Sequence, residues 1–262
     1  FALGFKRRGT WWIVESLDKD SGLFDEEFEN KLKEIRNYLE KTGLPAWHPP
    51  KKHGFYRYLT VRKSFANNQL LLNLTTSKSG LVHFDKQAFV DFVVGVFDDR
   101  IAGILHTIND SLGERSHNDE NDYEMLFGEN LIQENLLGLS FEVSMQSFFQ
   151  TNPKSAERLY SKVIDYVMED TEYSEDDTVM DLFCGTGTIG QLISKKTGVQ
   201  VVGVDIVSEA IENAKENAKR NKVETAKWFA ADVGKFLTQF PQYEGKIKTI
   251  VLDPPRGGIA PK

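Results

Sequence analysis

The sequence predicts an α/β protein in two parts: a smaller α+β domain, followed by a domain built on a doubly wound parallel sheet. Two observations carry this prediction. After residue 150, candidate strands and helices alternate regularly, which is typical of βαβ units. The first strand of that series runs into a glycine-rich turn, "DLFCGTGTIG" (181–190), of the kind that lets a backbone approach a ligand. We place the two domains at residues 1–137 and 138–262.

The first part mixes strands with helices. Strands are expected at 10–16, 56–63 and 69–76, and helices at 25–43 and 85–100, where apolar residues recur at three- and four-residue spacing. An acidic, polar segment near 109–124 lacks the apolar surface needed for packing, so we interpret it as an exposed loop or linker. Short strand-like pieces follow, up to residue 152.

The second part opens with an amphipathic helix over 152–170, with Asn152 as its N-cap and Pro153 at its first position. Strands are then expected at 177–183, 199–205 and 226–232, and from 248 onward. Helices are expected after the glycine turn and over 208–221 and 233–240. Sheets of this type bind ligands at the carboxyl ends of their strands.

Composition narrows the class of protein. The formal net charge of −7 argues against binding nucleic acid through bulk electrostatics. The longest apolar stretch, 89–97, is too short to cross a bilayer, and the first residues lack a secretory signal pattern. A single cysteine, Cys184, excludes an internal disulfide and a cysteine-cluster metal site. We therefore expect a cytoplasmic protein without a metal or a membrane partner.

Basic and aromatic residues are interleaved in two segments, "FKRRGTWW" (5–12) and "KKHGFYRYLTVRK" (51–63). Such mixtures suit unstacked bases and phosphates. The alternation within "YRYLTVRK" is also typical of a strand with one core face and one solvated face. Both interpretations, contact with RNA and an ordinary exposed strand, stay open.

Carboxylates stand at the ends of three successive candidate strands. Asp181 can pair with a ligand ammonium group or cap the glycine turn. Asp205 can accept from both hydroxyls of a ribose, and Asp232 can accept from the amine of an adenine. No Arg or Lys accompanies them to receive a diphosphate, so the set favours S-adenosylmethionine over a dinucleotide.

A fourth carboxylate, Asp253 in "LDPPRGG" (252–258), ends the last strand and precedes two prolines that hold the loop rigid. An ionised Asp only accepts hydrogen bonds, so it would select a base edge that offers N–H, as uracil does at nitrogen 3. The alternative is a capping role, which the prolines disfavour because they lack the donors that a cap satisfies.

Three segments together give the chain a recognisable pattern: "SFFQTNPKSAERLY" (147–160), "DLFCGTGTIG" (181–190) and "LDPPRGG" (252–258), after "LFGENLIQENLLGLSFEVS" (126–144). The chain resembles the RNA 5-methyluridine methyltransferase family. The resemblance implies a Rossmann-like S-adenosylmethionine methyltransferase fold, S-adenosylmethionine as cofactor, and tRNA or rRNA as the partner. It implies cofactor contacts at Gln150, Phe183, Thr188, Asp205 and Asp253, with Asp253 also positioning the uracil. From the chemistry of the turn and strand ends we add Asp181, Gly185, Gly187 and Asp232.

The family's mechanism, as the resemblance implies it, uses a cysteine thiolate to attack carbon 6 of uracil and a base to remove the proton of carbon 5. Cys184 lies in the cofactor turn rather than in the family's later Ser-Cys-Asn-Pro segment, so we interpret it as a packed loop thiol. Because the chain ends at Lys262, we expect a fragment with an incomplete methyltransferase domain that binds cofactor but does not methylate. These motifs specify neither the RNA, the uridine nor the oligomeric state.

Two other functions stay open. An amino-methyltransferase acting on a nucleobase or a protein could use Asp-Pro-Pro at the same strand end, although such enzymes usually have an aromatic residue where Arg256 stands. A non-catalytic module that binds cofactor or RNA is the third possibility. The position of a transferred methyl group would separate all three.

Overall fold

The computed structural model describes residues 1–111, 122–169 and 171–254. Its contacts divide the chain into two compact units: residues 1–132 with 144–146, and residues 133–143 with 147–262. Most of the acidic segment predicted near 109–124 lies outside the described residues, as does the end of "LDPPRGG", including Arg256. Among the residues described, no helix is both long and apolar enough to span a bilayer.

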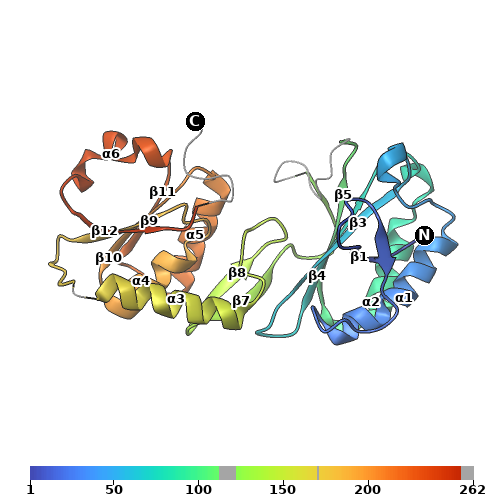
Figure 1. Ribbon diagram of the computed structural model, residues 1–262, viewed down its shortest axis with the longest axis horizontal. Helices are drawn as coiled ribbons and strands as arrows, with labels where there is room; N and C mark the ends of the chain where they lie inside the picture. Colours follow the sequence, from blue (N-terminus) through green and yellow to red (C-terminus); the bar gives the residue numbers. More distant parts are fainter. Residues whose placement is uncertain (112–121, 170, 255–262) are drawn as a thin grey trace. The chain divides into compact units, whose positions relative to one another are not determined.

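The first unit is an α+β structure (Figure 1). A four-stranded sheet has the order β3-β4-β5-β6, in which β4 and β5 run parallel and the outer pairs are antiparallel. A separate two-stranded sheet joins β1 to β2. In chain order the helices and strands are β1 (Gly4–Lys6), β2 (Val14–Ser16), α1 (Glu26–Lys41), η1 (Pro49–Lys51), β3 (Tyr56–Lys63), β4 (Leu70–Thr76), η2 (Leu81–His83), α2 (Lys86–Phe97), η3 (Asp98–Arg100), β5 (Ile101–Ile108) and β6 (Glu124–Gly128).

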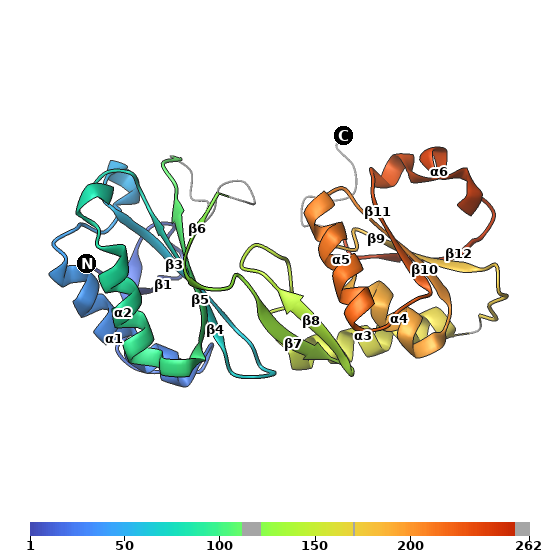
Figure 2. The same ribbon diagram turned by 180° about the vertical axis from the view of Figure 1, so that it is seen from behind.

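The core of this unit lies between the helices and one face of the sheet. Helices α1 and α2 lie on the same side of the sheet (Figure 2). Successive side chains of a strand point to opposite faces, so Leu70, Leu72 and Leu74 of β4 face the helices together, where they join Phe28 of α1 and Phe89 of α2 in one apolar cluster.

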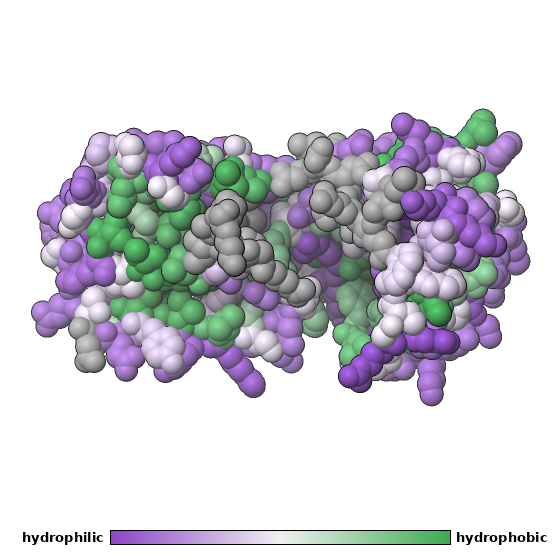
Figure 3. Space-filling view, turned by 45° about the horizontal axis from the view of Figure 1, so that its top comes forward, coloured by the Kyte–Doolittle hydropathy of each residue, from purple (hydrophilic) through white to green (hydrophobic). Residues whose placement is uncertain are grey.

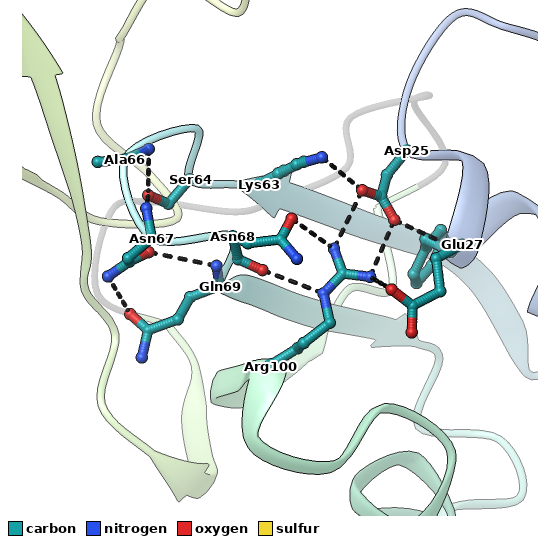
Figure 4. Close-up of polar contacts among 10 residues, drawn as sticks. Asp25, Glu27, Lys63, Ser64, Ala66, Asn67, Asn68, Gln69 and Arg100 are labelled. Atoms are coloured by element: carbon teal, nitrogen blue, oxygen red, sulfur yellow. Dashed lines mark hydrogen bonds and ion pairs between the residues drawn. The ribbon is translucent and has the colours of Figure 1, made fainter.

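A buried ion cluster holds the start of α1 (Figure 4). Asp25 is the N-cap, and its carboxylate accepts from the backbone N–H of Phe28 at 2.8 Å. The same carboxylate receives Lys63 Nζ at 2.5 Å and Arg100 Nη2 at 3.0 Å. The cluster therefore joins α1 to β3 and to the turn before β5.

One strand of this unit is shorter than predicted, and another was not predicted. The strand predicted over 10–16 is limited to Val14–Ser16, because Trp11 and Trp12 belong to the turn that links β1 to β2. Strand β5 was not predicted. It pairs with both β4 and β6 and is almost entirely buried, so its apolar run lacks the alternation that marks a half-exposed strand.

The second unit carries a parallel sheet with the order β11-β10-β9-β12, as the alternating pattern predicts. A small β7–β8 sheet precedes it. In chain order the helices and strands of the second unit are β7 (Ile132–Leu136), β8 (Leu139–Val143), α3 (Pro153–Met168), β9 (Thr178–Leu182), α4 (Thr188–Thr197), β10 (Gln200–Asp205), α5 (Ser208–Arg220), β11 (Ala226–Ala230), η4 (Val233–Lys235), α6 (Phe236–Gln239), η5 (Pro241–Tyr243) and β12 (Ile247–Leu252).

Helix α3 begins as its sequence predicts: the side chain of Asn152 accepts from the N–H of Ser155 at 3.1 Å, and Pro153 takes the first position. The strand order reverses at β9, because the chain adds β10 and β11 on one side of that strand and β12 on the other. Such a reversal opens a crevice at the carboxyl ends of the strands beside it. This crevice is the place where the fold predicts a ligand.

Strand β12 leaves apolar side chains exposed. Ile250 and Leu252 are 54% and 49% accessible. Figure 3 shows hydrophobic side chains gathered over one face of this unit. The expected helix over 233–240 is much shorter than predicted, since a 3-10 turn precedes the single helical turn of α6.

Candidate cofactor site

A small cavity lies where β9 and β12 end. It has a volume of about 60 Å³, enough for a group of a few atoms but not for a nucleoside. Three separate segments and the end of β12 meet around it. The predicted residues that line it are Gln150, Asp181, Phe183, Gly185, Thr188 and Asp253.

The glycine turn between β9 and α4 has the left-handed backbone that its sequence suggests. Gly185 and Gly187 have φ values of 52° and 73°. Phe183 adopts φ 62°, which is uncommon for a bulky residue and is characteristic of functional sites. The N–H groups of Phe183 and Cys184 both donate to the carbonyl of Val204, at 2.9 and 3.2 Å, and so tie the turn to β10.

The ring of the buried Trp228 packs against this turn. A Cβ atom at Gly187, Gly190 or Gly203 would lie 2.7, 2.9 or 2.2 Å from the ring of Trp228. By contrast, a Cβ at Gly185 would meet no atom within 4 Å. Gly187 is therefore required by packing as well as by φ, and Gly185 is the glycine that leaves open space beside the cavity.

Asp181 is the central acid of the site. It is 1% exposed, and its Oδ2 accepts from the N–H of Gly190 at 2.9 Å. Its Oδ1 is buried and has no hydrogen-bond partner among the described residues. Burial raises the pKa of Asp181 to about 7, and the charges of Asp253 and Asp205 act in the same direction. A buried oxygen of this kind needs a donor that a ligand can supply.

Asp205 lies behind the turn and has a structural task. Its Oδ2 accepts from the N–H of Gly185 at 2.9 Å, and its Oδ1 accepts from the N–H of Val207 at 3.0 Å. Each carboxylate oxygen has a second lone pair, so the carboxylate retains capacity for ribose hydroxyls. The predicted ribose contact of Asp205 stays a prediction, and the carboxylate also orders the turn.

Asp232 is not brought into the cavity. It is exposed, and its Oδ1 accepts from the N–H of Gly234 at 2.8 Å as the N-cap of η4. It stands beyond the end of β11 and does not line the cavity. Its contact with an adenine amine stays a prediction, because an adenine would lie outside so small a cavity.

Tyr160 is a site residue that the sequence interpretation missed. It lies on α3, is 4% exposed, lines the cavity, and its hydroxyl is hydrogen-bonded to the side chain of Gln150. Burial raises the pKa of Tyr160 to about 12, and the charges of Asp253 and Asp181 add to the effect. Tyr160 stands in "SFFQTNPKSAERLY", but on an amphipathic helix a tyrosine is also typical of a core position.

Thr188 and Cys184 complete the wall. Thr188 begins α4, and its Oγ1 lies 3.3 Å from Oγ1 of Thr186. Cys184 is the free cysteine, and burial raises the pKa of its thiol, with Asp181 and Asp205 adding to the effect. A thiol that resists ionisation is a poor nucleophile, which supports the interpretation of Cys184 as a packed loop thiol.

The charges of the residues that line the cavity favour a cationic ligand. Its lining carries Asp181 and Asp253, and no described lining residue is Lys or Arg. Such a site favours a small cationic group, whereas it repels a diphosphate. Across the described residues, no group of three or more His, Cys, Asp and Glu side chains is arranged to hold a metal ion.

The chain is similar to known methyltransferases. A family model described as a methyltransferase domain matches residues 173–255. RNA methyltransferases of Clostridium acetobutylicum and Clostridium tetani are 38% and 36% identical to the chain, over 99% of this chain and 54% of each relative. A tRNA (uracil(54)-C(5))-methyltransferase of Pyrococcus furiosus is 30% identical over 261 residues, covering 56% of its own length. The chain thus spans about half the length of these relatives.

A solved structure shares the fold. The tRNA (uracil-54, C5)-methyltransferase of Pyrococcus abyssi, in complex with S-adenosyl-L-homocysteine, superposes with a TM-score of 0.66 at 23% identity. The superposition covers 99% of this chain and 58% of that one. It confirms the predicted Rossmann-like methyltransferase fold preceded by an α+β domain, although the first unit is not the smaller of the two.

Proposed function

We propose that this chain belongs to a family of S-adenosylmethionine-dependent RNA methyltransferases, as its similarity to such proteins indicates, and that the protein transfers a methyl group from S-adenosylmethionine to carbon 5 of a uridine in tRNA or rRNA. The observation that carries the cofactor assignment is the buried Oδ1 of Asp181, which has no partner in the described part of the chain and borders a cavity sized for a small group. S-adenosylmethionine offers an ammonium group of that size.

Different residues of the second unit would contact different parts of the cofactor. Asp181 would accept from the ammonium of its amino-acid end, and Asp205 from the ribose hydroxyls beyond the open backbone at Gly185. Gln150 and Thr188 supply neutral polar groups to the lining of the cavity. When bound, the cofactor supplies an electrophilic methyl group on a sulfonium centre.

Asp253 is the residue suited to contact the nucleobase. It follows β12, is exposed, and lines the cavity, so it can reach both the cofactor and an incoming base. An ionised Asp253 accepts from the N–H of uracil nitrogen 3, whereas cytosine offers no donor there. We do not assign the thiolate that adds to carbon 6 to Cys184, because this residue is only partly exposed and the pKa of its thiol is raised.

The test is the position of the transferred methyl group. Unmodified tRNA and rRNA transcripts are incubated with the full-length protein and isotopically labelled S-adenosylmethionine, and the nucleosides are analysed by mass spectrometry. We expect label on carbon 5 of uridine. Label on an exocyclic amine would support the amino-methyltransferase alternative, and binding of cofactor and RNA without transfer would support a non-catalytic module.

A covalent trap tests the assignment of the cysteine. RNA that carries 5-fluorouridine should form a denaturation-resistant adduct with the full-length protein, because fluorine cannot leave as the carbon 5 proton does. The adduct should persist in the Cys184→Ser variant. Loss of the adduct in that variant would show that Cys184 is the nucleophile after all.

A further inference from the structure

A groove in the first unit is lined by aromatic rings. It has a volume of about 660 Å³ and is lined by the β1–β2 turn and by the segment between α1 and β3. Phe1, Trp12, Trp47 and His48 supply its rings, and Glu40 is the one carboxylate among its described lining residues. The groove belongs to this unit alone and shares no residue with the cofactor cavity.

The rings are arranged in a row and are partly available to solvent. The ring centroids of Trp12 and His48 are 5.2 Å apart, and those of His48 and His53 are 6.2 Å apart. Trp12 is 37% exposed. The guanidinium of Arg57 lies 4.3 Å from the ring centroid of Trp47 on one face, so that ring is held in place. A fixed row of partly exposed rings is a platform for planar groups.

Unpaired positive charge is concentrated beside this row. Lys51 and Lys52 occupy the turn between His48 and His53, whose backbones are joined by a 2.7 Å hydrogen bond. Arg8 lies in the turn between β1 and β2. All three side chains are exposed, and no ion pair or hydrogen bond among the described residues uses them.

Three other basic residues of the two basic and aromatic sequence segments have partners within the unit. Arg7 pairs with Glu15 at 2.7 Å, Arg62 donates to the carbonyl of Met145 at 3.1 Å, and Lys63 belongs to the ion cluster of Asp25. Phe55 and Tyr56 are buried in the core. These partners favour the groove and its rim over these residues as the place of RNA contact.

We propose that this groove binds an unpaired stretch of the substrate RNA, with bases stacked on Trp12 and His48 and phosphates beside Lys51 and Lys52. The proposal rests on the proposed function, because RNA as substrate comes from it. A chain of net charge −7 repels a polyanion over most of its surface, so exposed cations beside free rings give local charge complementarity. Paired bases cannot stack on side chains in this way, so the occupant is single-stranded.

Binding of two probes by the full-length protein tests the proposal: a short single-stranded oligouridylate and a hairpin duplex of equal charge, compared by electrophoretic mobility shift. We expect tighter binding of the single strand. Trp12→Ala should weaken that binding by about tenfold through loss of one stacked base. The double variant Lys51→Glu, Lys52→Glu should weaken it as well and lower its salt dependence, because two phosphate contacts are lost.

A matched control carries the same change of charge elsewhere. Lys196 and Lys219 are exposed on α4 and α5 of the second unit, and Lys196→Glu, Lys219→Glu should bind the probes as the wild type does. If Trp12→Ala and the Lys51, Lys52 variant bind the single strand like the wild type, or if the duplex binds as well as the single strand, the groove serves another occupant, such as a protein partner, and the proposal is overturned.

Failure of the proposed function has a different signature. Methyl transfer measured by mass spectrometry would then be missing in the wild type, whatever the groove does. Dependence of single-strand affinity on Trp12 and on the two lysines would still support the groove. Conversely, normal methyl transfer with unchanged RNA affinity in all variants would refute the groove and leave the proposed function intact.

Discussion

Asp25 in the first unit and Asp181 in the second are both buried aspartates, 5% and 1% exposed, but their partners differ. Both oxygens of Asp25 are used, by the N–H of Phe28 and by the cations Lys63 and Arg100 (Figure 4). Asp181 has the N–H of Gly190 on one oxygen and no partner on the other.

The same difference appears in the acidity of the two groups. Burial raises the pKa of Asp25, but hydrogen bonds from Arg100 and Lys63 outweigh it and lower that pKa to about 2. At Asp181 burial dominates and raises the pKa to about 7. A buried acid that the protein satisfies is a structural element, whereas one that the protein leaves unsatisfied is suited to a cationic ligand.

Replacing Arg100 with Ala would remove one of the two cations that satisfy Asp25 and should have the largest effect. Arg100 also donates to Glu27 at 2.6 Å, and the variant leaves a buried carboxylate with less compensation. We expect the free energy of unfolding at pH 7, measured by urea titration, to fall by about 3–5 kcal/mol.

The pH dependence of that loss has a definite sign. The folded pKa of Asp25 is depressed from 3.8 to about 2, so its stabilisation is present above pH 3.8 and disappears as the pH falls through 2. The deficit of Arg100→Ala should therefore shrink in acid. Arg8→Ala, at an exposed and unpaired position, is the control and should leave stability unchanged. A deficit below about 1 kcal/mol would show that the cluster is not structural.

Asp181→Asn tests the aspartate whose second oxygen the protein leaves unsatisfied. The folded pKa of Asp181 is raised from 3.8 to about 7, so its favourable protonation is complete below pH 3.8 and lost as the pH rises through 7. The neutral variant should therefore be more stable than the wild type at pH 8, by about 1–3 kcal/mol, and this advantage should diminish toward pH 5.

The same variant should bind the cofactor less well. Loss of a charged acceptor for the ammonium group should weaken binding of S-adenosylhomocysteine by at least about tenfold in isothermal titration calorimetry. The asparagine side chain of the variant keeps an acceptor for the N–H of Gly190, so the turn should stay intact. Equal affinity in the two proteins would mean that Asp181 is a capping residue like Asp25 and has no ligand.

The sequence predicts the second unit better than the first. Its parallel strands and crossover helices follow one another locally, and the carboxylates Asp181 and Asp253 stand at recognisable strand ends. In the first unit, β5 pairs with strands on both sides and is buried on both faces, so its pattern carries no alternation. Local sequence patterns indicate local structure, but they do not show which distant strands pair.

Within the site, the sequence shows which residues are chemically suited and not which ones meet. Asp205 and Asp232 look alike at successive strand ends, but one orders the glycine turn and the other caps a 3-10 turn away from the cavity. Tyr160 and Trp228 act through packing from other segments, which no local pattern reveals.

Asp205→Ala addresses an acid that lies between the two extremes, because its oxygens are satisfied by backbone N–H groups alone. If it also accepts from the ribose hydroxyls, affinity for S-adenosylhomocysteine should fall by about tenfold, since a hydrogen bond to a charged group is worth about 1.5–3 kcal/mol. Asp85→Ala is the matched control, an exposed acid that caps one N–H at the start of α2 in the first unit. Unchanged affinity in calorimetry would remove Asp205 from the site.

Tyr160→Phe should have the smallest effect. It removes one hydroxyl that is hydrogen-bonded to Gln150 and leaves the ring packed on α3. We expect about a fivefold loss of affinity for S-adenosylhomocysteine, which corresponds to a single neutral hydrogen bond of about 1 kcal/mol, with little change in the melting temperature. A large fall in melting temperature with unchanged affinity would assign Tyr160 to the core.

The indole beneath the glycine turn gives the second unit an optical reporter of its own. The chain has four tryptophans; three of them, Trp11, Trp12 and Trp47, belong to the first unit, and Trp228 is the one in the second. Trp228 is 7% exposed and touches the glycines of the turn, whereas Trp11 is 56% exposed. Emission at the blue edge of the spectrum should therefore follow the turn, and quenching by iodide should affect the emission of the first unit selectively. With the tryptophans divided in this way, events in the two halves of the chain can be distinguished without attaching a dye.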